Sequence, residues 1–240
     1  TPDHFISSEA TRLKFDLKAD KALTYSLSDL GCADISMALK LARDFLVANR
    51  RAKNVLIVYG HKQFAKYRFR YPVTITGDGG VAVWVSKSAN NQITDIAFDA
   101  NGYYWDLFKI DYKQKAWPNF VEECSDHRKY GFELAIESKN RFEAINKDVL
   151  ESNGLTKADI NHYLLQNISK RAYEYYNSAF DISISEACEV NLDAYGHLGP
   201  MDVMLNLYSG IQSGKFKEGE RVLIMNNSPV AAWTSILIKI

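Results

Sequence analysis

Apolar positions recur along this chain with two spacings, one typical of short buried strands and the other of amphipathic helices. Continuous apolar runs predict strands at Asn54–Gly60 and, close to the C-terminus, in RVLIMNNS and TSILIKI. A broad apolar stripe with helical spacing follows Cys32, and a longer one spans Phe132–Asn153. Because such strands and helices alternate along the chain, the pattern indicates an α/β protein.

Shorter signals predict the remaining elements. Further strands are expected at Leu23–Leu27, at Ile93–Gly102 and within Leu155–Ser169, two strands joined by a tight glycine turn at Thr74–Ser86, and helices within Thr1–Asp20 and at Lys170–Ala179 and Met201–Gly214. The aromatic-rich, irregular segment Tyr103–Asn119 is expected to be an insertion close to the substrate. No change of composition marks a linker, so one compact unit is predicted.

Composition and charge narrow the classes of function. Apolar residues make up 47% of the 240, which is enough for a sizeable core. Lys plus Arg and Asp plus Glu both number 29, so the chain lacks the basic field of nucleic-acid-binding proteins, and no nucleic-acid partner is expected. No apolar run reaches the length of a membrane span and no signal peptide is found, so no membrane partner is expected.

The cysteines are Cys32, Cys124 and Cys188, an odd number without CxxC or Cys/His spacing, so we expect no metal site and a cytoplasmic location. Cys32 lies where a helix is predicted to begin. The unpaired N–H groups and the dipole of a helix N-terminus favour the thiolate, which is the nucleophilic form. An inert buried thiol is the alternative that this stretch alone leaves open.

Two glycine motifs also deserve a functional interpretation. The GDGG stretch at Gly77–Gly80 lacks the spacing of a phosphate-binding loop and is predicted to be a tight turn. In DAYGHLGPMD, Gly196 and Gly199 bracket His197 directly before a helix, and glycines permit a tight backbone path that presents a side chain to a cavity. A solvated histidine in a helix-capping loop is the alternative.

Together these segments resemble the ketoacyl-ACP synthase III group of the thiolase-fold superfamily. The matching segments follow the family order: TPDHF, LGCADISMAL, NVLIVYG, TGDGGVAV, INHYLLQNISKR and DAYGHLGPMDVMLNLYSGIQSGKFKEGERVLIMNN. The resemblance implies a layered αβαβα thiolase-like fold and places Cys32 on the active cysteine. Residues 1–120 would be the remainder of the N-terminal half, with the nucleophile helix and the insertion, and residues 121–240 the C-terminal half.

The chain departs from the family at its other two catalytic positions. With Arg171 as the anchor of the alignment, the histidine of the His-Gln-Ala-Asn motif falls on Gln166, and the last asparagine of that motif falls on Ser169. The asparagine that follows glycine falls on His197, and the glycine-rich loop near the end falls on Ser228–Ser235. The family triad Cys-His-Asn is therefore altered.

The resemblance implies that Cys32 takes an acyl group from a CoA or acyl-carrier-protein thioester, that no further cofactor is needed, and that backbone N–H groups form the oxyanion hole. An imidazole exchanges protons near neutral pH and an amide does not. We therefore expect His197 to be the general base and Gln166 to position or polarise the bound substrate. Asp202 either orients His197 or only caps its helix, and His162 is the next candidate base. Substrate binding is expected at Ser169, Arg171 and Trp233.

These changes favour acyl transfer in specialised metabolism, with decarboxylative condensation by a β-ketoacyl synthase as the alternative. A third possibility is a non-catalytic subunit of a thiolase-fold heterodimer. Cys32 comes early for this fold, and the opening strands of the first half are missing. We therefore expect a homodimer, or a heteromer in which a separate chain supplies that part. The chain begins with Thr1, which suits a processed or truncated product.

Overall fold

The computed structural model describes residues 7–63, 66–111, 113–116 and 119–240, so the resemblance drawn from Thr1–Phe5 lies outside the described residues. The α-helices are α1 (Glu9–Asp16), α2 (Asp34–Ala48), α3 (Leu134–Ser152), α4 (Lys170–Phe180), α5 (Glu186–Tyr195) and α6 (Asp202–Gln212). The strands are β1 (Asn54–His61), β2 (Phe69–Arg70), β3 (Thr74–Ile75), β4 (Gly79–Ser86), β5 (Gln92–Ala100), β6 (Phe108–Ile110), β7 (Glu122–Cys124), β8 (His162–Leu165), β9 (Arg221–Asn227) and β10 (Ala232–Lys239).

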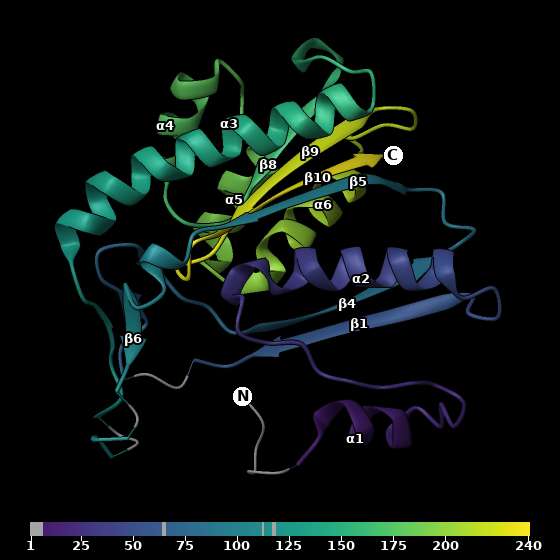
Figure 1. Ribbon diagram of the computed structural model, residues 1–240, viewed down its shortest axis with the longest axis horizontal. Coiled ribbons are helices and arrows are strands. Elements are labelled where there is room, and N and C mark those ends of the chain that lie inside the picture. The colour runs from purple at the N-terminus through teal and green to yellow at the C-terminus, as the bar shows by residue number, and fades with distance from the viewer. Residues whose placement is uncertain (1–6, 64–65, 112, 117–118) are drawn as a thin grey trace.

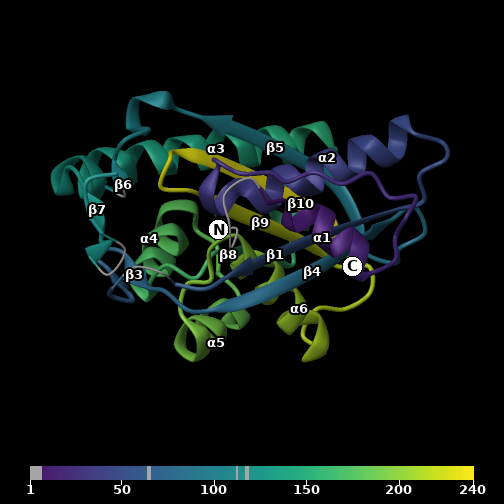
Figure 2. The ribbon, with the colours of Figure 1, turned by 90° about the horizontal axis from the view of Figure 1, so that it is seen from below.

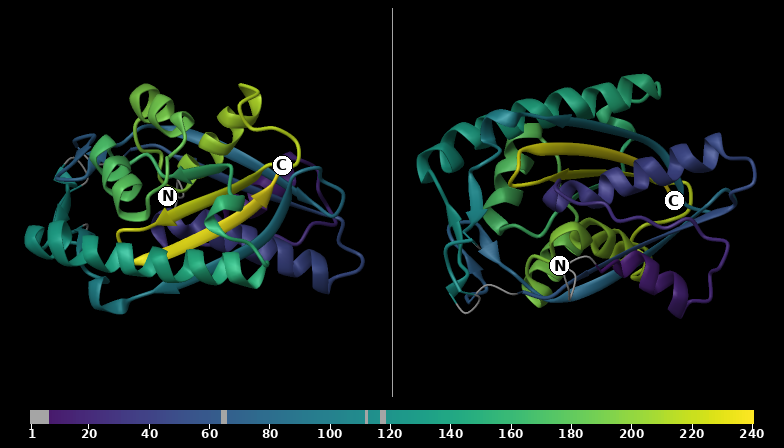
Figure 3. Two further views of the ribbon diagram at one scale, coloured as in Figure 1. Left: turned by 90° about the horizontal axis from the view of Figure 1, so that it is seen from above. Right: turned by 60° about the horizontal axis from the view of Figure 1, so that its bottom comes forward.

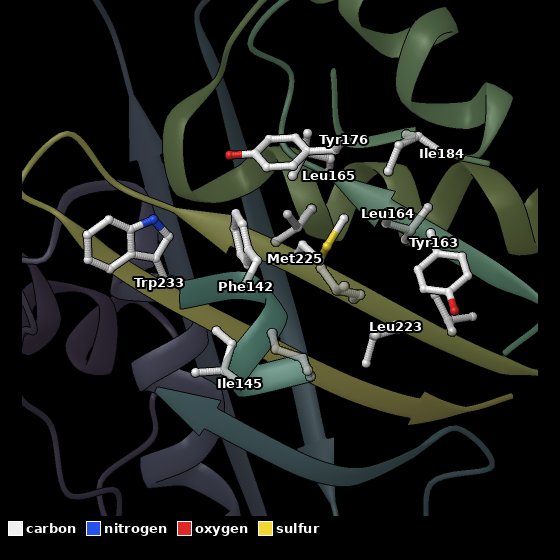
Figure 4. Close-up of a cluster of buried hydrophobic side chains, with 14 of the residues drawn as sticks. Phe142, Ile145, Tyr163, Leu164, Leu165, Tyr176, Ile184, Leu223, Met225 and Trp233 are labelled. Carbon is white, nitrogen blue, oxygen red and sulfur yellow. The ribbon is translucent and has the colours of Figure 1, made fainter. Parts of the chain in front are cut away.

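The largest sheet has the strand order β5-β10-β9-β8, in which β8 runs parallel to β9 and the other neighbours are antiparallel. The strands β9 and β10 are buried along nearly their whole length, which explains their continuous apolar runs. Side chains of α3, β8 and β9 meet in the hydrophobic cluster drawn in Figure 4. Burial of this apolar surface is the main force that holds the layer together.

The elements stack in layers, as Figure 1 shows. The long helix α3 covers one face of the four-stranded sheet, as the view from above in Figure 3 makes clear. The helices α2 and α6 lie between this sheet and the pair formed by β1 and β4. Because α2 faces a sheet on both sides, its apolar stripe is broad, with Ile35, Leu39 and Leu46 buried.

The second sheet consists of β1 and β4 alone among the described residues, and Figure 2 shows it from below. Its inward side chains, such as Ile57 and Val83, pack against the core. The outward pair Leu56 and Trp84 is 39% and 62% exposed, although both side chains are apolar. An exposed apolar sheet face is typical of a surface that packs against other polypeptide.

Three sequence-based expectations for the fold need correction. No strand forms at Leu23–Leu27, where the backbone has no ladder partner among the described residues and Leu23 is 77% exposed. The strands within Thr74–Ser86 are not paired with each other, because β3 pairs with β2 and β4 pairs with β1. The helix α5 was not predicted, since only a short segment of its surface is buried.

Most of the other predicted elements are confirmed, with ends shifted by a few residues. The strand β5 pairs with β10, so the four-stranded sheet includes a strand from before the division expected at residue 120. The aromatic-rich segment carries the short hairpin of β6 and β7. None of the described helices is long and apolar enough to cross a membrane.

Candidate active site

Cys32 lies in a single 3-10 turn, Gly31–Ala33, that leads directly into α2. The turn begins at Gly31 with φ of 56°, a left-handed conformation that glycine adopts without strain. The Cys32 carbonyl accepts a hydrogen bond of 2.8 Å from Nδ2 of Asn226 on β9. This hydrogen bond links the turn of Cys32 to the central sheet, and the thiol lies at the N-terminal end of α2.

His197 lies in the loop between α5 and α6, and two glycines bring this loop against the segment that precedes β4. A Cβ atom at Gly77 would lie 2.2 Å from the Tyr195 carbonyl oxygen, and one at Gly196 would lie 2.5 Å from that of Ile75. The two backbones also exchange hydrogen bonds, from His197 N–H to Ile75 and from Gly77 N–H to the His197 carbonyl. The GDGG stretch is thus a close-packing support for His197.

The side chains of Cys32, His197 and Asp202 form one hydrogen-bonded chain. Nε2 of His197 lies 3.3 Å from Sγ of Cys32, and Nδ1 lies 2.5 Å from Oδ2 of Asp202. The carboxylate also accepts the N–H groups of Asn167 and Leu198, so three donors hold it in place. A carboxylate only accepts, so Nδ1 carries the proton and Nε2 faces the thiol as the acceptor. Asp202 therefore orients His197.

The electrostatics of this chain favour a charged imidazole. Burial lowers the pKa of His197, but the charges of Asp202 and Cys32 outweigh it and raise the pKa to about 10. An unperturbed imidazole titrates near neutral pH, and the pKa of the buried His197 ring lies above that value. This raised pKa favours the imidazolium that forms when Nε2 accepts a proton.

Gln166 is 4% exposed and lines the same cavity as Cys32 and His197. Its Oε1 accepts the Asn227 N–H at 2.7 Å. Because the partner is a donor, the atom that it meets must be the amide oxygen, and the amide NH2 remains for other contacts. This arrangement fits a residue that positions a bound group.

The remaining cavity lining comes from elements far apart in the sequence. Apolar side chains form most of it, and the residues are Val73, Phe108, Tyr130, Leu134, Ile168 and Pro229. Arg70 adds one cation, which Glu122 on β7 pairs at 2.7 Å through Nε. The cavity volume is about 40 Å³, room for only a few atoms. A larger groove near Gly219 and Lys239 is lined by no cysteine, serine or histidine.

The other predicted site residues lie outside this lining. Ser169 caps the N-terminus of α4 by accepting the Ala172 N–H, and Arg171 is exposed on the same helix. The indole of Trp233 is fully buried, donates to Ser138 at 2.9 Å and belongs to the core cluster of Figure 4. Their roles in substrate binding stay predictions.

His162, the next candidate base, pairs with Glu220 at 2.8 Å on the edge strand β8, away from the cavity.

Sequence reasoning missed the buried amides that support the loop of His197. Asn167 donates through Nδ2 to the Gly196 carbonyl at 3.2 Å, and its own Oδ1 accepts from Asn206 at 2.9 Å. Asn206 in turn contacts Asn191. Buried amides need such partners, but nothing in the local sequence pattern says which ones they find. Within the described residues no cluster of three or more His, Cys, Asp or Glu side chains has the arrangement of a metal site.

Comparison with known proteins identifies the family of the chain. Residues 28–102 match the family model of 3-oxoacyl-[acyl-carrier-protein] synthase III, and residues 150–240 match the model of the C-terminal part of the same enzyme. The chain belongs to this family. The family models therefore cover both the turn that carries Cys32 and the loop that carries His197.

Individual relatives extend the family match over the whole chain. The chain is 27% identical to beta-ketoacyl-[acyl-carrier-protein] synthase III of Aliarcobacter butzleri, over 100% of its own length and 74% of the relative. The crystal structure of 3-oxoacyl-[acyl-carrier-protein] synthase III from Aquifex aeolicus superposes with a TM-score of 0.80 at 22% identity, again over 100% and 74% of the two chains. The acyltransferase ChlB3 matches with a TM-score of 0.80, at 19% identity and the same coverage. The fold is therefore thiolase-like.

Proposed function

We propose that this protein is an acyltransferase of the ketoacyl-ACP synthase III type, in which Cys32 carries the acyl group and His197 moves the protons. The observation that carries the proposal is the buried chain of Cys32, His197 and Asp202. This is the arrangement of a nucleophile, a general base and the group that orients the base. The departures at Gln166 and His197 support a specialised biosynthetic reaction.

In the first half-reaction Nε2 of His197 takes the thiol proton of Cys32. The thiolate attacks the carbonyl carbon of a CoA or acyl-carrier-protein thioester, so that a new C–S bond forms and the carbonyl oxygen becomes an oxyanion. When the intermediate collapses, the C–S bond of the donor breaks. The leaving thiolate takes the proton from His197 and departs as a free thiol.

In the second half-reaction an acceptor with an O–H or N–H group enters the cavity. Nε2 of His197, now neutral, removes its proton while the acceptor attacks the thioester on Cys32. The C–S bond to Cys32 breaks, and the thiolate beside the imidazolium is restored. Asp202 holds the ring in the required tautomer through both halves, since it contacts only Nδ1.

Decarboxylative condensation is the second candidate, because the relatives are named as synthases. It would need two donors to hold the enolate that remains when a malonyl group loses carbon dioxide. Gln166 offers an amide NH2 and His197 offers Nε2–H in its charged form. The contact of Nδ1 with Asp202 supports transfer to a heteroatom instead, because that reaction needs an oriented proton acceptor beside Cys32.

A non-catalytic subunit is the third candidate. The retained thiol, its contact with the imidazole and the cavity beside it all support a catalytic chain. We also propose that further polypeptide, from a second copy or a companion chain, covers the outward face of β1 and β4 in the working enzyme. The edges of this sheet pair with no further strand in the described part of the chain, and this supports that assembly, as do the exposed Leu56 and Trp84.

The deciding experiment is to incubate the protein with acetyl-, malonyl- and longer acyl-CoA thioesters and to measure intact mass. We expect an acyl adduct on the wild type, none on Cys32→Ala, and a retained adduct on the control variant Cys188→Ala. An adduct that persists in Cys32→Ala, or none with any thioester, would contradict the proposal. Release of carbon dioxide from the malonyl thioester would favour condensation.

A further inference from the structure

The tetrahedral intermediate on Cys32 needs hydrogen-bond donors for its oxyanion, and the cavity wall formed by residues 227–229 has no spare backbone donor. The Asn227 N–H is bonded to Gln166, and the Ser228 N–H is bonded to the Ala232 carbonyl at 2.9 Å. Pro229 has no N–H at all. A donor on this wall must therefore come from a side chain.

The Ser228 hydroxyl is free to fill that role. Ser228 is 2% exposed, lines the cavity with Cys32, and its Oγ has no hydrogen-bond partner among the described residues. Its carbonyl is also used, because it accepts the Ala231 N–H at 3.0 Å. A buried hydroxyl without a partner costs free energy, and one that also lines the cavity beside Cys32 is a candidate donor to a bound group.

The position of Ser228 is fixed from two sides. A Cβ atom added to Gly31 would lie 3.4 Å from the Ser228 Cβ, so the serine packs directly against the residue that precedes Cys32. The turn that carries it is closed at Ala231, which has φ of 54°, a left-handed value that is unusual for a residue other than glycine. Such a turn holds a donor in place before the reaction begins, which is what an oxyanion hole requires.

We propose that the Ser228 hydroxyl is an oxyanion-hole donor for the acyl group on Cys32, in place of a backbone N–H. The proposal rests on the acyl-enzyme of the proposed function. The hydroxyl donates to the carbonyl oxygen as its charge develops and keeps its own proton throughout. No bond of Ser228 forms or breaks, so His197 remains the only group of the pair that transfers a proton.

The test compares two reactions of Cys32 that differ in their need for an oxyanion hole. Acylation by acetyl-CoA passes through an oxyanion, whereas alkylation by iodoacetamide displaces iodide from an sp3 carbon and does not. We expect Ser228→Ala to slow single-turnover acylation by roughly a hundredfold, the usual loss of one such donor, and to leave the alkylation rate unchanged.

Two sets of controls separate the hydroxyl from packing. Ser235→Ala removes another buried hydroxyl without a partner, on β10 and outside the cavity lining, and is expected to leave both rates unchanged. Ser228→Thr and Ser228→Val have nearly the same size and differ in the hydroxyl. We expect the threonine variant to acylate at least tenfold faster than the valine variant, which keeps the test valid if the alanine variant folds poorly.

Three results would overturn the proposal. Acylation of Ser228→Ala at the wild-type rate would remove Ser228 from the reaction, although Cys32 would still be the nucleophile. A parallel fall of acylation and alkylation would give Ser228 a purely structural role. A wild type that is alkylated by iodoacetamide but never acylated by a thioester would overturn the proposed function and, with it, this inference.

Discussion

The Nε2 atom of His197 lies 3.3 Å from the Sγ atom of Cys32, although 165 positions separate the two residues in the chain. The imidazole is buried, and its other nitrogen is held by Asp202 at 2.5 Å. This single contact joins the turn before α2 to the loop before α6. It places a buried imidazole beside the thiol that we propose as the nucleophile.

The first prediction concerns the division of labour between His197 and Gln166. We expect His197→Ala to slow both acylation and transfer by roughly a hundredfold or more, the range for loss of a general base. Gln166→Ala should cost less, because the amide positions a group and moves no proton. Single-turnover rates measured by rapid quench and intact mass test this. Greater damage from Gln166→Ala would make His197 a structural residue.

The second prediction concerns the pH dependence of transfer to the acceptor. The transfer needs neutral imidazole, so its rate should rise as the pH rises through the pKa of His197, which the charges of Asp202 and Cys32 raise to about 10. In the acyl-enzyme the sulfur carries no charge, so that only Asp202 of these two residues raises the pKa. Asp202→Asn removes this charge, so the midpoint of the rate profile should move to lower pH.

The plateau of that profile should also fall in Asp202→Asn, because an asparagine can favour the wrong tautomer of His197. Glu186→Gln, on the exposed surface of α5, is the matched control and should leave both midpoint and plateau unchanged. Transfer rates at a series of pH values supply the measurement. An unchanged midpoint in Asp202→Asn would show that the carboxylate does not set the pKa of the base.

The third prediction concerns the close approach that supports His197. A Cβ atom at Gly77 would lie 2.2 Å from the Tyr195 carbonyl oxygen, and backbone must move to admit it. We therefore expect Gly77→Ala to lower both the unfolding midpoint and the acylation rate. Gly102→Ala is the control, since a Cβ there meets nothing within 4 Å. Thermal unfolding followed by circular dichroism tests the pair, with acylation measured in parallel. Equal unfolding midpoints and equal acylation rates in the two variants would contradict the argument.

The fourth prediction concerns assembly through the outward face of β1 and β4. Trp84 is 62% exposed there, and a charge at its centre should oppose contact with other apolar polypeptide. We expect Trp84→Glu to reduce the mass of the native assembly in sedimentation velocity. Tyr208→Glu alters an equally exposed aromatic on α6, at 61%, and should leave the assembly intact. A wild type that sediments as a monomer would remove the assembly proposal.

Much of the fold could be predicted from the sequence because the signals are local. The apolar run of β9 and the helical stripe of α2 follow from the order of side chains within each segment, so the α/β class and most elements follow as well. Cys32 at a helix start and His197 between two glycines are also local patterns. Their family match then made them candidates for the nucleophile and the base, with Gln166 beside them.

Only the tertiary structure decided how these groups are arranged, since their partners come from distant segments. Asp202 could have served the helix dipole alone, but it contacts Nδ1, and its charge, together with that of Cys32, raises the pKa of His197. The hydroxyl of Ser228 acquired a candidate role because its own backbone groups are already bonded and Pro229 has no N–H. A strand at Leu23–Leu27 needs a neighbour to complete its hydrogen bonds, and no local pattern can supply one.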